Sequence, residues 1–104
     1  MEGLTMNIKI NSLRFSPTKK LETFVEGKVK KLGTFYDDII GAEVYLKLEK
    51  SQKMENKIAE IKLDLPGNEL FAKKQSKSFE ESTDSAINAL KKQITKHKNK
   101  KKRA

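Results

Sequence analysis

The last fifteen residues, Leu90 to Ala104 (LKKQITKHKNKKKRA), carry the most distinctive chemistry of the chain. From Lys91 onward they include eight Lys or Arg residues and no acidic residue. Lysine ammonium groups are point charges that bind phosphate oxygens, so this run suits a polyanion such as nucleic acid. The alternative is a solvated tail whose cations match the dipole at a helix C-terminus. Eight cations without one interspersed acid exceed what that alternative requires, which favours a phosphate partner.

The net charge of +9 is concentrated in this run. Without its eight basic residues the chain keeps 15 Lys and Arg against 14 Asp and Glu, a balance of +1. A charge focused in one place attracts polyanions and steers their approach. Only two residues are arginines, which argues against sequence-specific recognition of guanine.

Residues that could support catalysis or bind a metal ion are few. His97, the only histidine, stands among lysines without a visible partner to orient it as a general base. Asp37 and Asp38 are adjacent, and neighbouring loop carboxylates rarely converge on one ion without further ligands. The chain has no cysteine, no glycine-rich phosphate loop and no nucleophile motif. We therefore expect neither an enzyme nor a cofactor, a metal ion or a small-molecule substrate.

Length and composition indicate one domain with a single modest core, because the chain has 104 residues and 36% of them are hydrophobic. No apolar run approaches the ~20 residues of a membrane span. The N-terminus lacks the basic start and the apolar stretch of a secretory signal. We expect a cytoplasmic protein without a membrane partner.

Four segments alternate apolar and polar residues with the period of two that is typical of half-buried strands. They comprise residues 6–10, 42–49, 59–65 and 70–74. The sequence PGN at 66–68 has the composition of a tight turn. The last three strands should form an antiparallel meander. The first can pair in parallel with the second, because a helical pattern separates them.

Two other segments carry apolar residues at helical spacing. The first is predicted to begin with Ser16 as N-cap and Pro17 at the first helical position, and to end at Gly33. The second opens with Ser78 and Glu81, which have the spacing of a capping box. Its apolar periodicity fades after Ile94, so the packed helix should end near residues 96–98.

The resulting order, β-α-β-β-β-α, predicts an α+β fold in which both helices cover one face of a four-stranded sheet. Residues 1–98 would form this single domain, and residues 99–104 a basic, disordered tail. On a helical projection Lys92 and Lys96 lie opposite the apolar stripe of the second helix, while Lys91 and Lys98 flank it. The first helix adds a weaker basic cluster that includes interspersed acids, so ordinary i,i+4 ion pairing is an equal alternative there.

Three stretches resemble the short ribosome hibernation-promoting factors, also known as ribosome-associated inhibitors. They are MNIKI (6–10), FVEGKVKKLGTFYDDIIGAEVYLKLEK (24–50) and SFEESTDSAINALKKQITKHKNK (78–100), and they span nearly the whole chain. The stretch KKQITKHKNK is the most specific of them. On this resemblance, residues 1–5 are expected to be either an extension before the first strand or the result of an alternative start.

The resemblance implies a fold similar to double-stranded RNA-binding domains. It also implies a protein that binds the small ribosomal subunit, occupies the mRNA and tRNA channel at the A and P sites, and inhibits translation under stress and in stationary phase. In that family, basic helix residues contact rRNA phosphates. The matching positions, with two lysines added by proximity, are Lys28, Lys31, Lys91, Lys92, Lys96, Lys98 and Lys100.

The chain departs from the family pattern at the start of its second helix. Ser78 replaces an acidic residue, and Ser82 and Thr83 replace apolar ones, so we expect a looser first turn. The resemblance leaves open whether the protein promotes ribosome dimers and whether a helper factor for dimerisation takes part. Two other functions also fit the residues: a general double-stranded RNA-binding module or RNA chaperone, and an adaptor whose basic end binds an acidic protein.

Overall fold

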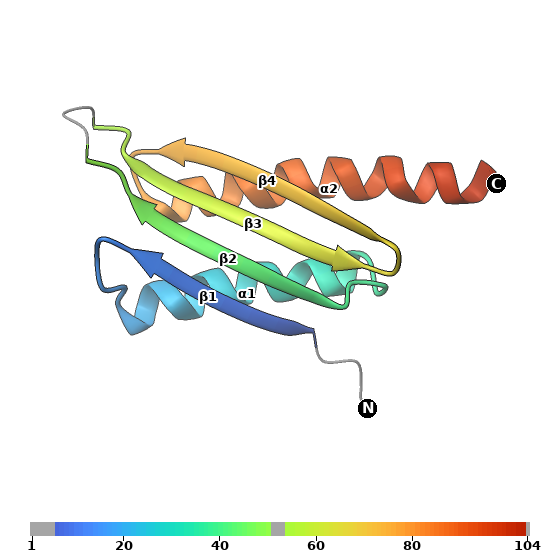
Figure 1. The fold of residues 1–104 in the computed structure, drawn as a ribbon, viewed down its shortest axis with the longest axis horizontal. Coiled ribbons are helices and arrows are strands. Elements are labelled where there is room, and N and C mark those ends of the chain that lie inside the picture. Colours follow the sequence, from blue (N-terminus) through green and yellow to red (C-terminus); the bar gives the residue numbers. More distant parts are fainter. Residues whose placement is uncertain (1–5, 51–53, 104) are drawn as a thin grey trace.

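The computed structural model describes residues 6–50 and 54–103, except for the side chains of residues 100–103. Its elements are β1 (Asn7–Leu13), α1 (Lys19–Phe35), β2 (Gly41–Leu48), β3 (Lys57–Leu65), β4 (Asn68–Ser76) and α2 (Phe79–Arg103). The strands form one sheet in the order β1-β2-β3-β4, and both helices lie side by side on one face of it (Figure 1). The predicted α+β fold is therefore confirmed.

The strand pairing also follows the prediction. β1 pairs in parallel with β2, whereas β2, β3 and β4 form an antiparallel meander. Pro66 and Gly67 make the turn between β3 and β4, and Gly67 has a positive φ of 72°, which glycine adopts at no steric cost. β4 is longer than predicted because its backbone stays paired with β3 from Asn68 to Ser76, although most of its side chains are polar.

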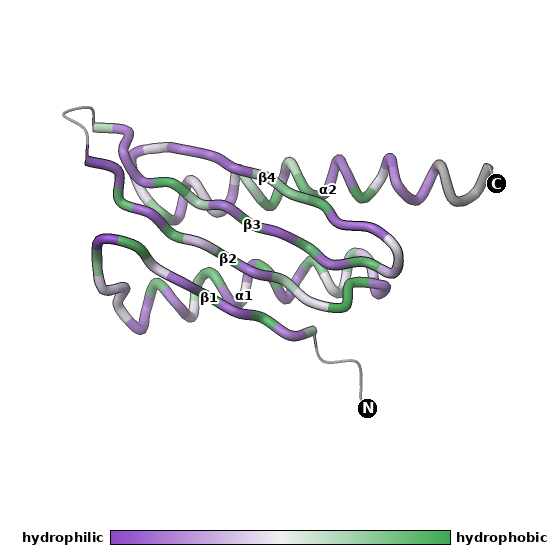
Figure 2. The backbone as a smooth tube through the Cα atoms, in the orientation of Figure 1, coloured by the Kyte–Doolittle hydropathy of each residue, from purple (hydrophilic) through white to green (hydrophobic). Residues whose placement is uncertain are grey.

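The core lies between the sheet and the helix layer. Hydrophobic and hydrophilic residues alternate along the strands (Figure 2), and alternate residues of the central strands, such as Val44, Leu46, Ile61 and Leu63, belong to the core. From the helices, the side chains of Val25, Val29, Leu32, Leu90 and Ile94 are fully buried. Both apolar stripes predicted from helical spacing are thus the faces that pack on the sheet.

The start of α1 differs from the prediction. The helix begins at Lys19, and its N-cap is Thr18, whose hydroxyl accepts a hydrogen bond from Leu21 N at 3.1 Å. The prediction of Ser16 as the cap is wrong, and Pro17 precedes the helix instead of occupying its first position. Both hydroxyls are suitable caps, so the local sequence did not distinguish between them. The cap at Thr18 places Leu21, the first buried residue of the stripe, in the first turn of the helix.

The end of α1 differs as well. The helix continues through Gly33 to Phe35, and Tyr36 is its C-cap, so Gly33 does not terminate it. A Cβ atom built on Gly33 would lie 3.0 Å from Cε of Met6, just before β1. The glycine therefore permits close packing of the helix against the N-terminal end of the sheet, and it is not used for a left-handed turn.

The first turn of α2 is better anchored than expected. Ser78 caps the helix as predicted, because its hydroxyl accepts from Glu81 N at 3.1 Å. The Ser82 hydroxyl lies 2.6 Å from the carbonyl oxygen of Lys57 in β3 and 2.8 Å from the hydroxyl of Ser76 in β4. The expectation of a looser start is wrong, since a serine in place of an apolar residue ties the helix to two strands.

The far end of α2 extends beyond its predicted limit near residues 96–98. The helix continues to Arg103, so the stretch expected to be a disordered tail is helical up to that residue. Lysine is a good helix former, and cations at a helix C-terminus interact favourably with the helix dipole. An existing helix can therefore propagate without an apolar stripe. In Figure 1 these last turns project past the β3–β4 turn.

Two adjacent buried hydroxyls in α2 should respond in opposite ways to removal. Ser82→Ala should lower the free energy of unfolding by about 1–3 kcal/mol, because the Lys57 carbonyl loses its hydroxyl partner. Thr83→Val should raise it by about 1 kcal/mol, because Thr83 Oγ1 is buried and has no hydrogen-bond partner among the described residues. Urea unfolding of the two variants would measure both effects. A loss of stability in Thr83→Val would contradict this assignment.

Candidate nucleic-acid interface

The outward side of α2 carries two lysines that are exposed to solvent. Leu90 and Ile94 are buried against the sheet, whereas Lys92 and Lys96 are exposed. In the part of the chain that the structure describes, neither ammonium group has a carboxylate within ion-pair distance. The predicted orientation of these two lysines is confirmed. One side of the helix is committed to the core and the other presents uncompensated positive charge.

A second pair of lysines on α2 lies toward α1. Lys91 and Lys98 are two helical turns apart, so they share one side of the helix, and both approach the ring of Phe35 at the end of α1. Lys98 Nζ is 5.4 Å and Lys91 Nζ is 5.9 Å from the ring centroid. Because α1 and α2 are in direct contact, this side chain cluster bridges the two helices.

On α1, the two predicted binding residues differ in their surroundings. Lys28 forms an ion pair with Asp84 of α2 at 3.0 Å and also lies over the ring of Phe24. Lys31 is exposed and has no ion-pair partner among the described residues. The acid that neutralises Lys28 comes from the other helix, so spacing along α1 could not reveal it. Lys28 therefore contributes less free positive charge than its sequence environment indicated.

The seven predicted lysines all belong to the two helices, and the structure describes the side chains of six of them. Lys100 belongs to α2, but its side chain lies outside the described residues. The other six line the outer surface of the two helices, and five of them have no ion-pair partner in the described part of the chain. Those five are Lys31, Lys91, Lys92, Lys96 and Lys98.

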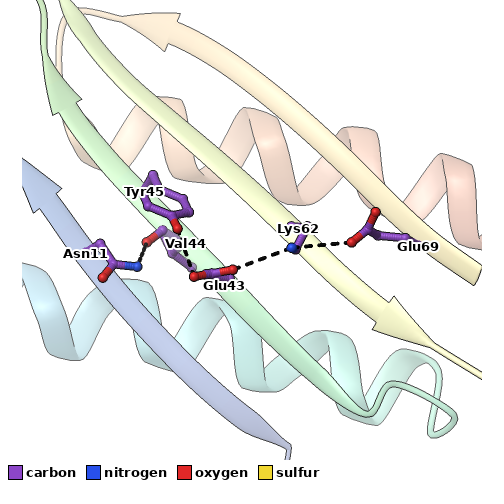
Figure 3. Close-up of polar contacts among 6 residues, drawn as sticks. All are labelled: Asn11, Glu43, Val44, Tyr45, Lys62 and Glu69. Atoms are coloured by element: carbon purple, nitrogen blue, oxygen red, sulfur yellow. Dashed lines mark hydrogen bonds and ion pairs between the residues drawn. The ribbon is translucent and has the colours of Figure 1, made fainter.

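The opposite face of the sheet is electrostatically different. Lys62 lies between Glu43 at 3.6 Å and Glu69 at 3.3 Å, and the Tyr45 hydroxyl donates to Glu43 at 2.8 Å (Figure 3). Farther along the same face, Lys47 and Lys73 both pair with Glu60. The opposite charges within these cross-strand ion pairs neutralise each other, so the sheet face attracts a phosphate backbone only weakly.

The pKa shifts on this face follow from the same contacts. The hydrogen bond from Tyr45, together with nearby Lys62, lowers the pKa of Glu43. That bond raises the pKa of Tyr45, because losing the phenolic proton would place two negative charges side by side. The hydrogen bond and charge of Glu69 raise the pKa of Lys62. All three shifts favour the charge states that hold the network together near neutral pH.

The residues considered for catalysis have structural partners. His97 lies edge-on to the ring of Tyr36, and its Nδ1 is 3.3 Å from Asn68 Nδ2 in the β3–β4 turn region. Asp38 accepts a hydrogen bond from the Tyr36 hydroxyl at 3.2 Å. Among the described residues, no three His, Cys, Asp or Glu side chains are placed to hold a metal ion. No helix in that part of the chain is both long and apolar enough to cross a membrane.

Phe35 is the residue of this surface that the sequence did not single out. This residue is 40% exposed although it ends an otherwise well-packed helix, and the two lysines of α2 lie beside its ring. An aromatic residue at the end of an amphipathic helix usually belongs to the core. Only the contact between the helices shows that this one belongs to the basic surface.

The model of the Sigma 54 modulation protein / S30EA ribosomal protein family matches residues 8–102. The ribosome hibernation promoting factor of Klebsiella oxytoca is 32% identical over 95 residues, which are 91% of this chain and 96% of that protein. A ribosomal subunit interface protein from Coxiella burnetii has a similar fold, with a TM-score of 0.80 at 21% identity over 90% of this chain and 99% of that one. The N-terminal domain of Thermus thermophilus Protein Y gives a TM-score of 0.75 at 26% identity, covering 88% of this chain and 99% of that one. The chain therefore belongs to the Sigma 54 modulation protein / S30EA ribosomal protein family, the family of the ribosome hibernation promoting factors.

Proposed function

We propose that this protein is a ribosome hibernation factor that binds the small ribosomal subunit in the cytoplasm and inhibits translation without catalysis. It occupies the mRNA and tRNA channel, including the A and P sites, and blocks their use by steric exclusion. The observation that carries this proposal is the asymmetry of charge. Lysines without ion-pair partners among the described residues gather on the helix layer, whereas the sheet face neutralises its own charges.

Lysine–rRNA phosphate contacts hold the protein in place. Lys92 and Lys96 bind from the outward side of α2, Lys91 and Lys98 from the side near α1, and Lys31 from α1 itself. Lys28 takes part by exchanging its ion pair with Asp84 for a phosphate, and Lys100 adds charge near the end of α2. The names of the matched relatives support a ribosomal partner, since they are called ribosome hibernation promoting factors.

Binding to small subunits should weaken steeply as salt concentration rises, because each lysine–phosphate contact releases a counterion. With about six phosphates neutralised, the plot of log affinity against log salt should have a slope near −5, or about −4 if the RNA behaves as single strands. Cosedimentation of the protein with purified small subunits across a salt series would measure this slope. Binding that does not change with salt would refute the phosphate mechanism.

The same assay separates the alternatives. Equal affinity for naked duplex RNA and for intact subunits would identify a general RNA-binding module. Retention of the protein by a nuclease-treated extract would identify an adaptor that binds an acidic protein. Preference for the intact subunit, lost after nuclease treatment, is the result expected for a hibernation factor.

A further inference from the structure

Two neighbouring aromatic residues at the end of α1 differ in exposure, although Lys98 Nζ approaches both rings, at 5.4 Å from the Phe35 centroid and 5.8 Å from the Tyr36 centroid. Tyr36 is only 8% exposed and packs edge-on against His97. Phe35 is 40% exposed and faces the basic surface of the helix layer. A large apolar ring at the surface of a strongly charged protein has a hydration cost that contact with a flat apolar partner would remove.

The cations around Phe35 are free to bind something else. Lys91 and Lys98 approach its ring, and neither has a carboxylate within ion-pair distance in the part of the chain that the structure describes. Cation–π contacts at exposed sites are weaker than the stacking of a nucleobase on an aromatic ring. An RNA strand could therefore replace the ammonium groups at the ring with a base and take those ammonium groups onto its phosphates.

The combination of an exposed ring with flanking cations is the one that proteins use to hold unpaired nucleotides. A base within a duplex cannot stack on such a ring, because its faces are covered by its neighbours. A ring flanked by two lysines thus favours a single-stranded or bulged segment of RNA over a regular helix.

We propose that Phe35 is a stacking platform for one unpaired nucleobase, with Lys91 and Lys98 binding the phosphates on either side of it. This inference rests on the proposed function, because it specifies which RNA the helix layer contacts. It assigns a role to a residue outside the set of lysines, and it makes recognition at this point dependent on local unpairing of the RNA.

Phe71 provides a matched control within the same chain. It is 51% exposed, but it lies on β4, where its neighbours belong to the self-neutralised sheet face. The two phenylalanines therefore have similar exposure, but Phe35 lies among cations without ion-pair partners in the described part of the chain, and Phe71 among charges that neutralise each other. The chain has no tryptophan, so a single Trp introduced at either position would be the only indole in the protein.

The test is a fluorescence titration of Phe35→Trp and Phe71→Trp with single-stranded oligoadenylate and with a duplex RNA of equal length. Stacking should quench the emission of Phe35→Trp with the single strand and leave Phe71→Trp unchanged. In parallel, Phe35→Leu, which removes the aromatic ring, should weaken binding to oligoadenylate by about tenfold. Phe35→Tyr, which keeps a ring, should bind like the wild-type protein. Circular dichroism and urea unfolding verify that each variant is folded. Equal responses of the two Trp variants, or natural affinity in Phe35→Leu, would overturn the proposal.

Its failure is distinguishable from failure of the proposed function. If Phe35→Leu binds oligoadenylate and small subunits like the natural protein while the salt slope stays steep, stacking is refuted and the hibernation factor stands. If the natural protein does not bind small subunits but Phe35→Trp is still quenched by oligoadenylate, the platform stands and its RNA is not ribosomal.

Discussion

Replacing both Lys92 and Lys96 with Glu should abolish binding to small ribosomal subunits while leaving the fold intact. Each charged hydrogen bond to a phosphate contributes about 1.5 kcal/mol or more, so losing two of them lowers affinity by at least about 100-fold. The repulsion between the new carboxylates and the phosphates adds to this loss. Cosedimentation at fixed salt, together with inhibition of translation in a cell-free system, would measure it.

The fold should survive because both side chains are exposed on the side of α2 opposite Leu90 and Ile94. Both positions lie seven or more residues before the end of α2 at Arg103, outside its last turn, so the new carboxylates are little affected by the helix dipole. Circular dichroism should therefore show the natural helix content, and the urea midpoint should decrease only slightly.

The matched control for this double variant is Lys9→Glu with Lys77→Glu. Both residues are exposed and lie outside the helix layer, and the change in net charge is the same. If the position of the cations determines binding, this control should lose only the general electrostatic attraction. Equal loss in both double variants would mean that net charge alone governs binding, and full inhibition by Lys92→Glu, Lys96→Glu would mean that α2 does not contact the RNA.

The regular spacing of apolar residues along the strands and helices explains why most of the fold could be predicted from the sequence. The alternation in β2 and β3 identifies which side chains face inward, and this in turn determines the register in which Val44 meets Ile61. The ends of helices were predicted less well. They depend on which of several nearby residues acts as the cap, or on a contact with a residue that is distant in the sequence. Thr18 was preferred over Ser16 as the cap of α1, and Gly33 continues the helix because Met6 packs close to it.

The same distinction applies to the candidate site. The outward orientation of Lys92 and Lys96 follows from helical periodicity alone, so it could be predicted. The pairing of Lys28 with Asp84 and the placement of Phe35 beside Lys98 depend on how two helices pack together. Residues of different elements become neighbours only in the folded chain, and no spacing in the sequence records that contact.

Truncating Ile94 to Ala should destabilise the protein more than any surface change. The side chain is fully buried (0% exposed), and removing three carbons from such a site costs about 2–5 kcal/mol. Ile40→Ala is the matched control, since it is the same substitution at a residue that is 59% exposed, and it should change the free energy of unfolding by less than about 0.5 kcal/mol. Urea unfolding of both variants would measure the difference.

The effect of Ile94→Ala should also extend to binding, because this isoleucine is the last buried residue of α2 among the side chains that the structure describes. The helical turns beyond it carry Lys96 and Lys98, and His97, which contacts Tyr36 and Asn68 there, is only half-buried. Under conditions in which the variant is still folded, amide hydrogen exchange should increase selectively after residue 94. Affinity for small subunits should also fall, because these lysines must be ordered before they can bind. Unchanged exchange in that segment would show that the end of α2 is stable without Ile94, and that the contacts of His97 with Tyr36 and Asn68 suffice to hold it.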